Sequence, residues 1–334
     1  MLVRVPDYFD RFHCLVGACP HSCCEKWEVM IDEGSAMLYR GIEGALGEKL
    51  RSALQQDEEG DLCFLLKGGR CPFLDEENLC EIHRELGEEA TSITCREHPR
   101  FTEDYGSFRE ITLSASCPAA NHLLLENQKP LYFLERRTEE KEEKGDPWLE
   151  DLLPIRDGML DLLRNREYPL KVRLGRLLQW AEAVQPYLDE DCLKRLEEIA
   201  LPEKLTFWAI LPKESLQLLQ KLEKLEEDWS VLLTAAERKS VEICDDALER
   251  IAVYFAFRYL LKCINDGDLL SRAQLVVFSV LTVEKLAAEC GLSEALRRFS
   301  CEVEHSQNNL YTLLNAFQWE TSFALERFME NWQR

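Results

Sequence analysis

The chain has 334 residues, and its 62 acidic and 40 basic side chains give it a formal charge of −22 at pH 7. This length allows about two domains and is ample for a core, and a hydrophobic content of 46% excludes a disordered acidic tail. The acidity argues against a nucleic-acid partner, because phosphate binding depends on clustered Lys and Arg side chains.

The N-terminal residues carry charges where a signal peptide would have its apolar segment. The longest largely apolar run covers 275–283, far short of the roughly 20 residues that span a bilayer, so we predict a buried helix there. We therefore expect a cytoplasmic chain with no membrane partner. The sequence does not indicate its oligomeric state.

The N-terminal part of the chain, residues 1–135, holds most of the turn signals. A helix is expected over 32–55, where apolar residues recur every three to five positions. Short strands are expected over 62–66, 71–74 and 79–83, with Gly-containing and acidic turns between them. Pro20 is typical of a first helical position, so a helix is expected to begin beside Cys19.

A charged segment at 136–147 ends in Gly-Asp-Pro and is the expected linker. Residues 148–334 show helical periodicity, and the nearly continuous apolar run within 235–265 predicts a central buried helix. The predicted fold is mainly α: a cysteine-rich metal-binding domain with short β-hairpin elements at 1–135, followed by an α-helical domain at 148–334.

Nine of the 14 cysteines fall within the first 117 residues, and a cytosolic chain so rich in cysteine more often binds metal than forms disulfides. Cys63 lies in an apolar run and is expected to be a packed thiol, as are the five scattered cysteines of the second half. The candidate metal ligands are the other eight: Cys14, Cys19, Cys23, Cys24, Cys71, Cys80, Cys95 and Cys117.

The spacing of these cysteines does not separate zinc from an iron–sulfur cluster, since four thiolates satisfy either one. Cys23 and Cys24 are adjacent, so Cys24 is expected to point to a different ligand position, a second metal or a redox partner. His83 and His98 follow Cys80 and Cys95 at zinc-like spacing, although the thiols suffice without them.

The order of these motifs resembles the flagellin lysine-N-methylase family, which is related to cysteine-cluster proteins with zinc- or iron-chelating domains. The matching cysteine-block segments are 14–19, 23–32, 71–74, 79–82, 86–87, 95–100 and 116–120, and the matching helical segments are 156–173 and 253–259. The family has a Tyr where this chain has His98. The resemblance implies a methyltransferase that uses S-adenosylmethionine to methylate flagellin lysines and carries an iron–sulfur cluster of the 4Fe-4S type.

The sequence assigns no catalytic residue and no residue that binds the methyl donor. The Gly-x-Gly-x-x-Gly signature after a strand is absent, so a methyl donor would bind on a different scaffold. The alternative function is a non-enzymatic protein that binds an iron–sulfur cluster or zinc and acts as a redox sensor or adaptor.

Overall fold

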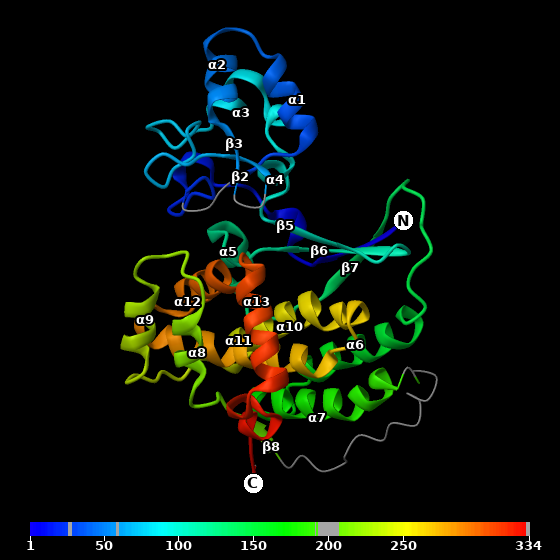
Figure 1. Ribbon diagram of the computed structural model, residues 1–334. Coiled ribbons are helices and arrows are strands. Elements are labelled where there is room, and N and C mark those ends of the chain that lie inside the picture. The colour runs from blue at the N-terminus through cyan, green and yellow to red at the C-terminus, as the bar shows by residue number, and fades with distance from the viewer. Residues whose placement is uncertain (26–28, 58–59, 191, 193–206, 332–334) are drawn as a thin grey trace. The chain divides into compact units, whose positions relative to one another are not determined.

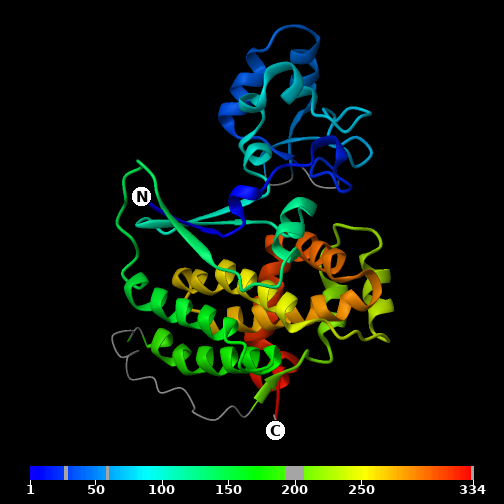
Figure 2. The same ribbon diagram turned by 180° about the vertical axis from the view of Figure 1, so that it is seen from behind.

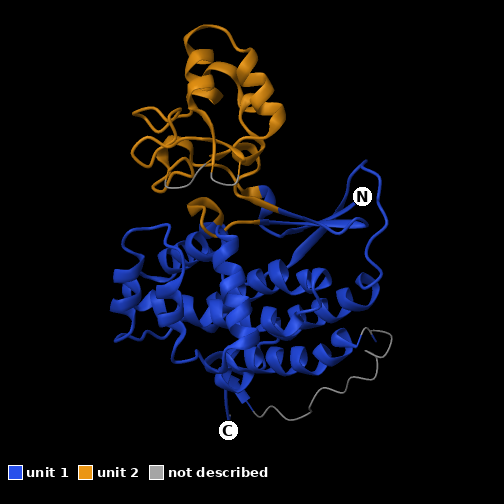
Figure 3. Ribbon diagram, in the orientation of Figure 1, with its two compact units in different colours: residues 1–10, 102–112, 121–334 blue, residues 11–101, 113–120 orange. Residues whose placement is uncertain are grey.

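The computed structural model describes residues 1–25, 29–57, 60–190, 192 and 207–331 (Figure 1). The chain divides into two compact units, which Figure 3 shows in different colours. Unit 1 comprises Met1–Asp10, Thr102–Thr112 and Asn121–Arg334, and unit 2 comprises Arg11–Phe101 and Leu113–Ala120.

The two units are bounded at other residues than the predicted linker at 136–147, and a four-stranded sheet explains why. The predicted domain division itself stays a prediction. Strand β1 (Leu2–Pro6) pairs in parallel with β6 (Phe108–Leu113) and antiparallel with β7 (Phe133–Arg137). Strand β5 (Arg100–Asp104) completes the order β5-β6-β1-β7. The sheet therefore brings both ends of the N-terminal segment into unit 1, and β7 includes the first residues of the predicted linker.

Helices make up most of unit 1. They are α6 (Leu149–Arg164), α7 (Leu170–Asp189), α8 (Ser215–Lys221), α9 (Trp229–Ala236), α10 (Asp245–Tyr259), α11 (Leu269–Cys290), α12 (Leu292–Phe299) and α13 (Gln307–Trp319). Shorter elements are η5 (Leu260–Asn265), η6 (Ser300–Glu304), η7 (Thr321–Phe323), η8 (Leu325–Phe328) and the strand pair β8 (Phe207–Ala209) and β9 (Met329–Asn331). The prediction of a mainly α fold is confirmed.

Helices α10 and α11 form the centre of unit 1 (Figures 1 and 2). Every residue of α10 from Leu248 to Tyr259 is buried, and α11 packs against α7, α10, α12 and α13. The buried helices predicted within 235–265 and over 275–283 are thus confirmed, because side chains that are apolar all round leave no face for water. Among the described residues, no helix is long and apolar enough to cross a membrane.

Buried carboxylates connect these helices. The fully buried Glu249 of α10 accepts hydrogen bonds from Arg173 Nη1 of α7 at 2.6 Å and from Arg166 Nη2 at 2.9 Å. Removing one partner of such a group leaves an uncompensated charge in the core. This lowers the free energy of unfolding by more than an exposed ion pair adds to it.

A second buried carboxylate, Glu304 of η6, lies where α10 meets the C-terminal helices. Arg258 Nε lies 2.7 Å from its Oε1, and the hydroxyls of Tyr254 and Tyr259 each donate to it at 3.0 Å. The Arg and Tyr side chains on these two carboxylates belong to segments 156–173 and 253–259, which carry the resemblance in the helical half. Their role in the fold is to join helices through polar contacts.

Unit 2 is built from short elements. They are η2 (Val16–Ala18), β2 (Val29–Met30), α1 (Glu33–Gly41), α2 (Gly44–Ala53), β3 (Leu54–Gln56), β4 (Leu62–Phe64), α3 (Glu81–Leu86), η3 (Glu88–Ala90) and α4 (Ile93–Glu97). The strands form a three-stranded sheet in the order β2-β4-β3. Helix α5 (Pro118–Leu125) begins in unit 2 and ends in unit 1.

Several local predictions for unit 2 were wrong. The helix expected over 32–55 is two helices, because the chain turns at Ile42 and Glu43 and Gly44 has a φ of +79°. The strand expected over 79–83 is instead the start of α3, and 71–74 forms turns with only an isolated bridge between Leu74 and Cys80. No helix begins at Pro20, where the chain continues in turns.

We predict that Glu249→Ala lowers the free energy of unfolding by about 3–5 kcal/mol, because Arg173 would stay buried without its carboxylate and Arg166 would lose one of its ion pairs. The measurement is urea unfolding of the full chain, followed by far-ultraviolet circular dichroism. Asp161→Ala is the control: Asp161 pairs with Arg164 at 3.0 Å, but its side chain is 77% exposed, so a loss below about 0.5 kcal/mol is expected. Equal losses in the two variants would contradict this role of Glu249.

Candidate functional site

All eight candidate metal ligands lie in unit 2. Seven fall within Arg11–Phe101, and Cys117 returns to the same unit with Leu113–Ala120. The chain leaves unit 2 after Phe101 to form strands of the sheet in unit 1 and comes back 11 residues later. Sequence segments that are far apart thus supply thiols to one compact unit.

Backbone hydrogen bonds place three of the cysteines side by side. The Cys24 carbonyl accepts from the Cys71 N–H at 2.8 Å, and the Cys71 carbonyl accepts from the Leu74 N–H at 3.1 Å. Leu74 in turn forms an antiparallel bridge with Cys80. Next to these residues, the Glu25 carboxylate lies 2.8 Å from Arg70 Nη1, and this ion pair also joins the segment of Cys24 to that of Cys71.

The same three cysteines border the hydrophobic core of unit 2. Cys71 is a member of that core, 8% exposed, and Cys24 and Cys80 pack against it. The core also contains Phe64 and Phe73, whose rings are 4.7 Å apart. These three thiols therefore lie at the margin of an apolar cluster.

Cys95 is positioned by two hydrogen-bonding side chains. It lies on α4, where the Ser92 hydroxyl accepts from the Cys95 N–H at 3.3 Å as the N-cap. Asp32 accepts from the Ser35 N–H through Oδ1 and from the Ile93 N–H through Oδ2, each at 2.9 Å, so one carboxylate caps α1 and holds the start of α4. Although desolvation opposes it, these hydrogen bonds lower the pKa of Asp32 to about 2.

The remaining four cysteines lie on turns and at a helix start. Cys14 and Cys19 flank η2, with the Val16 N–H donating to Cys14 Sγ at 3.4 Å and the Cys19 N–H donating to the Val16 carbonyl at 3.0 Å. Cys117 immediately precedes α5. The Cys23 side chain hydrogen-bonds to that of Cys24, which raises the pKa of Cys23 and lowers that of Cys24.

Desolvation raises the pKa of most of these thiols. It raises the pKa of Cys71 to about 12 and that of Cys95 to about 11, and the pKa values of Cys80, Cys19 and Cys117 are raised too. Without metal these thiols are therefore protonated at neutral pH, so metal binding would release their protons.

No group of three or more His, Cys, Asp or Glu side chains in the described part of the chain forms a metal-binding arrangement. The metal-binding role of the eight cysteines thus stays a prediction. Of the two histidines at zinc-like spacing, His83 is exposed, while burial lowers the pKa of His98 to about 4 and keeps its ring uncharged at neutral pH.

The other six cysteines divide between core and surface. Cys63 on β4 is 2% exposed and Cys263 on η5 is 1% exposed, which confirms the prediction of packed thiols for both. Cys244, which precedes α10, is exposed, so that prediction was wrong for it. Cys192, Cys290 and Cys301 are half-buried.

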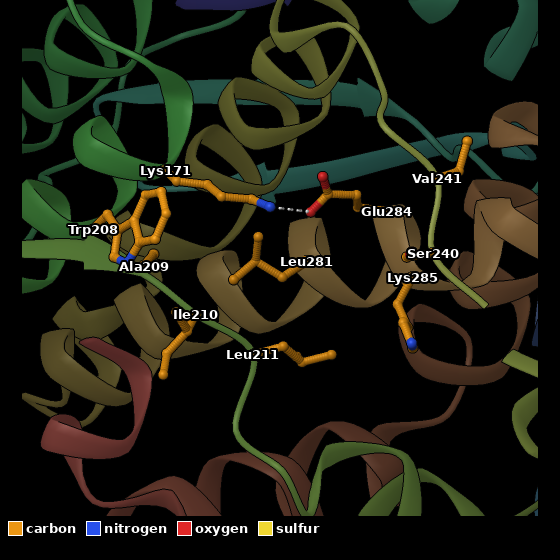
Figure 4. Close-up of a pocket in the computed structure, with 10 residues that line it drawn as sticks. All are labelled: Lys171, Trp208, Ala209, Ile210, Leu211, Ser240, Val241, Leu281, Glu284 and Lys285. Atoms are coloured by element: carbon orange, nitrogen blue, oxygen red, sulfur yellow. Dashed lines mark ion pairs between the residues drawn. The ribbon is translucent and has the colours of Figure 1, made fainter. Parts of the chain in front are cut away.

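A cavity of about 310 Å³ lies in unit 1, and none of the residues that line it is a cysteine (Figure 4). Trp208 borders it at one end, and the Lys171 Nζ and the Glu284 Oε2, 3.0 Å apart, form an ion pair across it. The carboxylate in this cavity is already matched by a lysine, so we assign no ligand to it.

Comparison with known proteins finds curated relatives in Salmonella. The chain is 24% identical over 218 residues to the Lysine-N-methylase of Salmonella typhimurium and equally to that of Salmonella choleraesuis, which covers 61% of this chain and 53% of each relative. It is 26% identical over 145 residues to the flagellar biosynthetic protein FliU of Salmonella muenchen, which covers 41% of this chain and 84% of FliU.

The resemblance to the lysine-N-methylase family is confirmed. The chain spans about half the length of the Lysine-N-methylases that it matches. No family model matches the chain, and no solved structure matches it.

Sequence reasoning missed the residues that position Cys95. Ser92 stands three residues before Cys95, and Asp32 three residues before Ser35, which is the spacing of an N-cap and its amide partner. That local signal was available for both residues. The hydrogen bond from Ile93 to Asp32 had no such signal, since it joins positions 61 residues apart.

We predict that Asp32→Ala lowers the free energy of unfolding by about 2 kcal/mol, because it removes an N-cap and leaves the Ile93 N–H without its acceptor. The measurement is urea unfolding of the full chain.

Glu43→Ala is the matched control for Asp32→Ala. Glu43 occupies the N-cap of α2, but its side chain makes no capping hydrogen bond, so a change below about 0.5 kcal/mol is expected. If the control variant were destabilised as much as Asp32→Ala, the assigned role of Asp32 would be wrong.

Proposed function

We propose that this chain is a cytoplasmic protein-lysine N-methyltransferase. It transfers a methyl group from S-adenosylmethionine to flagellin lysines, and its cysteines in unit 2 hold an iron–sulfur cluster of the 4Fe-4S type. The observation that carries the proposal is the similarity over 218 residues to proteins named Lysine-N-methylase. The similarity to a flagellar biosynthetic protein supports flagellin as the substrate.

The donor set of unit 2 fits an iron–sulfur cluster. Four cysteine thiolates ligate such a cluster, and unit 2 brings eight candidate thiols into one compact body. Cys24, Cys71 and Cys80 border an apolar core, which limits solvent access on that side. When bound, the cluster would supply one-electron redox chemistry or an iron that acts as a Lewis acid. Zinc is the alternative for the same thiols.

The transfer itself sets two requirements for the protein. The lysine nitrogen attacks the methyl carbon of the sulfonium, a C–N bond forms, and the C–S bond breaks to release the thioether. The amine must be neutral to attack, and because the reference pKa of Lys is about 10.4, the site must desolvate the ammonium or accept its proton. The charge of −22 would attract a lysine-bearing substrate surface over a distance.

A second candidate function is a non-enzymatic redox sensor or adaptor that binds an iron–sulfur cluster or zinc. The contact between the adjacent Cys23 and Cys24 thiols favours it, since a thiol that hydrogen-bonds to a thiolate of lowered pKa is a reactive arrangement. The methylation experiment below separates the two functions.

We predict that the anaerobically purified chain transfers label from methyl-labelled S-adenosylmethionine to lysines of flagellin. Mass spectrometry of the digested flagellin would locate the methyl groups. Flagellin with its lysines chemically acetylated is the control, because its amines are no longer nucleophiles. Metal binding without lysine labelling in several flagellins would favour the sensor and overturn the methyltransferase.

We predict that Cys95→Ala lowers the iron and sulfide bound per chain by at least half, because the variant lacks one thiolate of a cluster. The measurement is iron, sulfide and zinc analysis of anaerobically purified protein. Cys290→Ala is the control, since this half-buried thiol at the end of α11 belongs to unit 1. Equal metal contents in the two variants would refute the assignment of Cys95.

A further inference from the structure

Four of the eight candidate thiols form a complete set, which we call the inner quartet: Cys24, Cys71, Cys80 and Cys95. Each thiol of the inner quartet interacts electrostatically with each of the other three. Such pairwise interactions require short separations, because they weaken with distance in a partly solvated site. These four side chains therefore lie in one region of unit 2, although no three of them form a metal-binding arrangement among the described residues.

The backbone supports this convergence independently of the thiols. The Cys24 carbonyl bonds to the Cys71 N–H, and Cys80 bridges Leu74, three residues after Cys71. On the other side, α4 is held to the start of α1 by the hydrogen bond between Ile93 and Asp32. The loops that carry the inner quartet are thus fixed to each other and to the core of unit 2.

The other four thiols, Cys14, Cys19, Cys23 and Cys117, form the outer quartet. Cys14, Cys19 and Cys117 each interact with the other two, and Cys23 interacts with Cys14. The turn η2 between Cys14 and Cys19 packs tightly: a Cβ on Gly17 would lie 2.8 Å from the Glu77 carbonyl oxygen. Only glycine fits at this contact, which sets the position of the outer segment against the loop before Cys80.

The adjacent pair Cys23 and Cys24 contributes one thiol to each quartet. The two thiols hydrogen-bond to each other, and Cys23 also interacts electrostatically with Cys14 of the outer quartet and with Cys95 of the inner one. A zinc ion or an iron–sulfur cluster takes four thiolates, and the inner quartet already has four without Cys23. The hydrogen bond between Cys23 and Cys24 and the electrostatic interactions of Cys23 with Cys95 and of Cys19 with Cys24 indicate that the two quartets are neighbours.

We propose that the eight thiols form two separate four-thiolate metal centres, one on the inner quartet and one on the outer quartet. This inference rests on the metal binding of the proposed function and specifies it. Each centre takes a thiophilic metal ion or an iron–sulfur cluster, and binding draws its four sulfurs together. The outer quartet has two exposed thiols, Cys14 and Cys23, and the inner quartet one, Cys95, so the outer centre is the more accessible to chelators.

The test is an anaerobic titration of the reduced, metal-free full chain with Co²⁺, whose thiolate charge-transfer absorption counts the ions bound to sulfur. The unaltered chain should bind two Co²⁺ ions. Cys80→Ala and Cys117→Ala should each bind one, their combination none, and the control Cys290→Ala two. In the unaltered chain, a chelator should first remove the ion bound by the outer quartet, which is the ion that Cys117→Ala lacks.

Binding of a single Co²⁺ by the unaltered chain would overturn the proposal. So would the loss of both ions in either single variant, or the retention of both in either. Should Cys80→Ala lose the fold of unit 2 by circular dichroism, Cys95→Ala tests the same centre from an exposed position. Two bound ions without lysine methylation would overturn the proposed methyltransferase activity but support the two metal centres. One bound ion with lysine methylation would support the methyltransferase activity but overturn the two metal centres.

Discussion

The arrangement of thiols in unit 2 depends on the hydrogen bond from the Cys71 N–H to the Cys24 carbonyl, which is 2.8 Å long. It joins the cysteine-rich N-terminal segment to the turn before α3, and the ion pair of Arg70 with Glu25 reinforces it. The strands of unit 2 are only two or three residues long, so strand pairing holds little of this unit together. Small bodies with short elements and a limited core often depend on metal or disulfide cross-links.

Unit 1 is stabilised in a different way. Its helices α10 and α11 are buried nearly all round, and carboxylates such as Glu249 and Glu304 join neighbouring helices through arginine and tyrosine side chains. Those arginines and tyrosines carry the resemblance in the helical half, and their contacts are internal to the fold. These contacts belong to the scaffold of unit 1, while the thiols of unit 2 are the part with distinctive chemistry.

The features of the fold that depend on composition and periodicity could be predicted from the sequence. The buried helices within 235–265 and over 275–283, the packed Cys63 and the concentration of eight thiols in the N-terminal segment could all be derived from it. Long-range pairing could not be derived. The sheet that unites β1, β6 and β7 carries no local signal, nor does the hydrogen bond between Asp32 and Ile93.

Turn chemistry explains the remaining differences between prediction and structure. The apolar spacing over 32–55 suits one helix, but the positive φ at Gly44 divides it into two. The segment 79–83 reads as a strand by its residues, yet it becomes the start of α3 because Cys80 stands at the N-cap position after a turn. The proposed division of the thiols into two quartets depends on the loops that these turns bring together, which the sequence pattern does not reveal.

Native mass spectrometry of the full chain, purified without oxygen, tests the central claim most directly. The mass added to the polypeptide identifies what the thiols of unit 2 hold and how many centres are present. The account predicts two metal centres per chain, at least one of them with the mass of an iron–sulfur cluster. A chain that carries no metal under these conditions would contradict it.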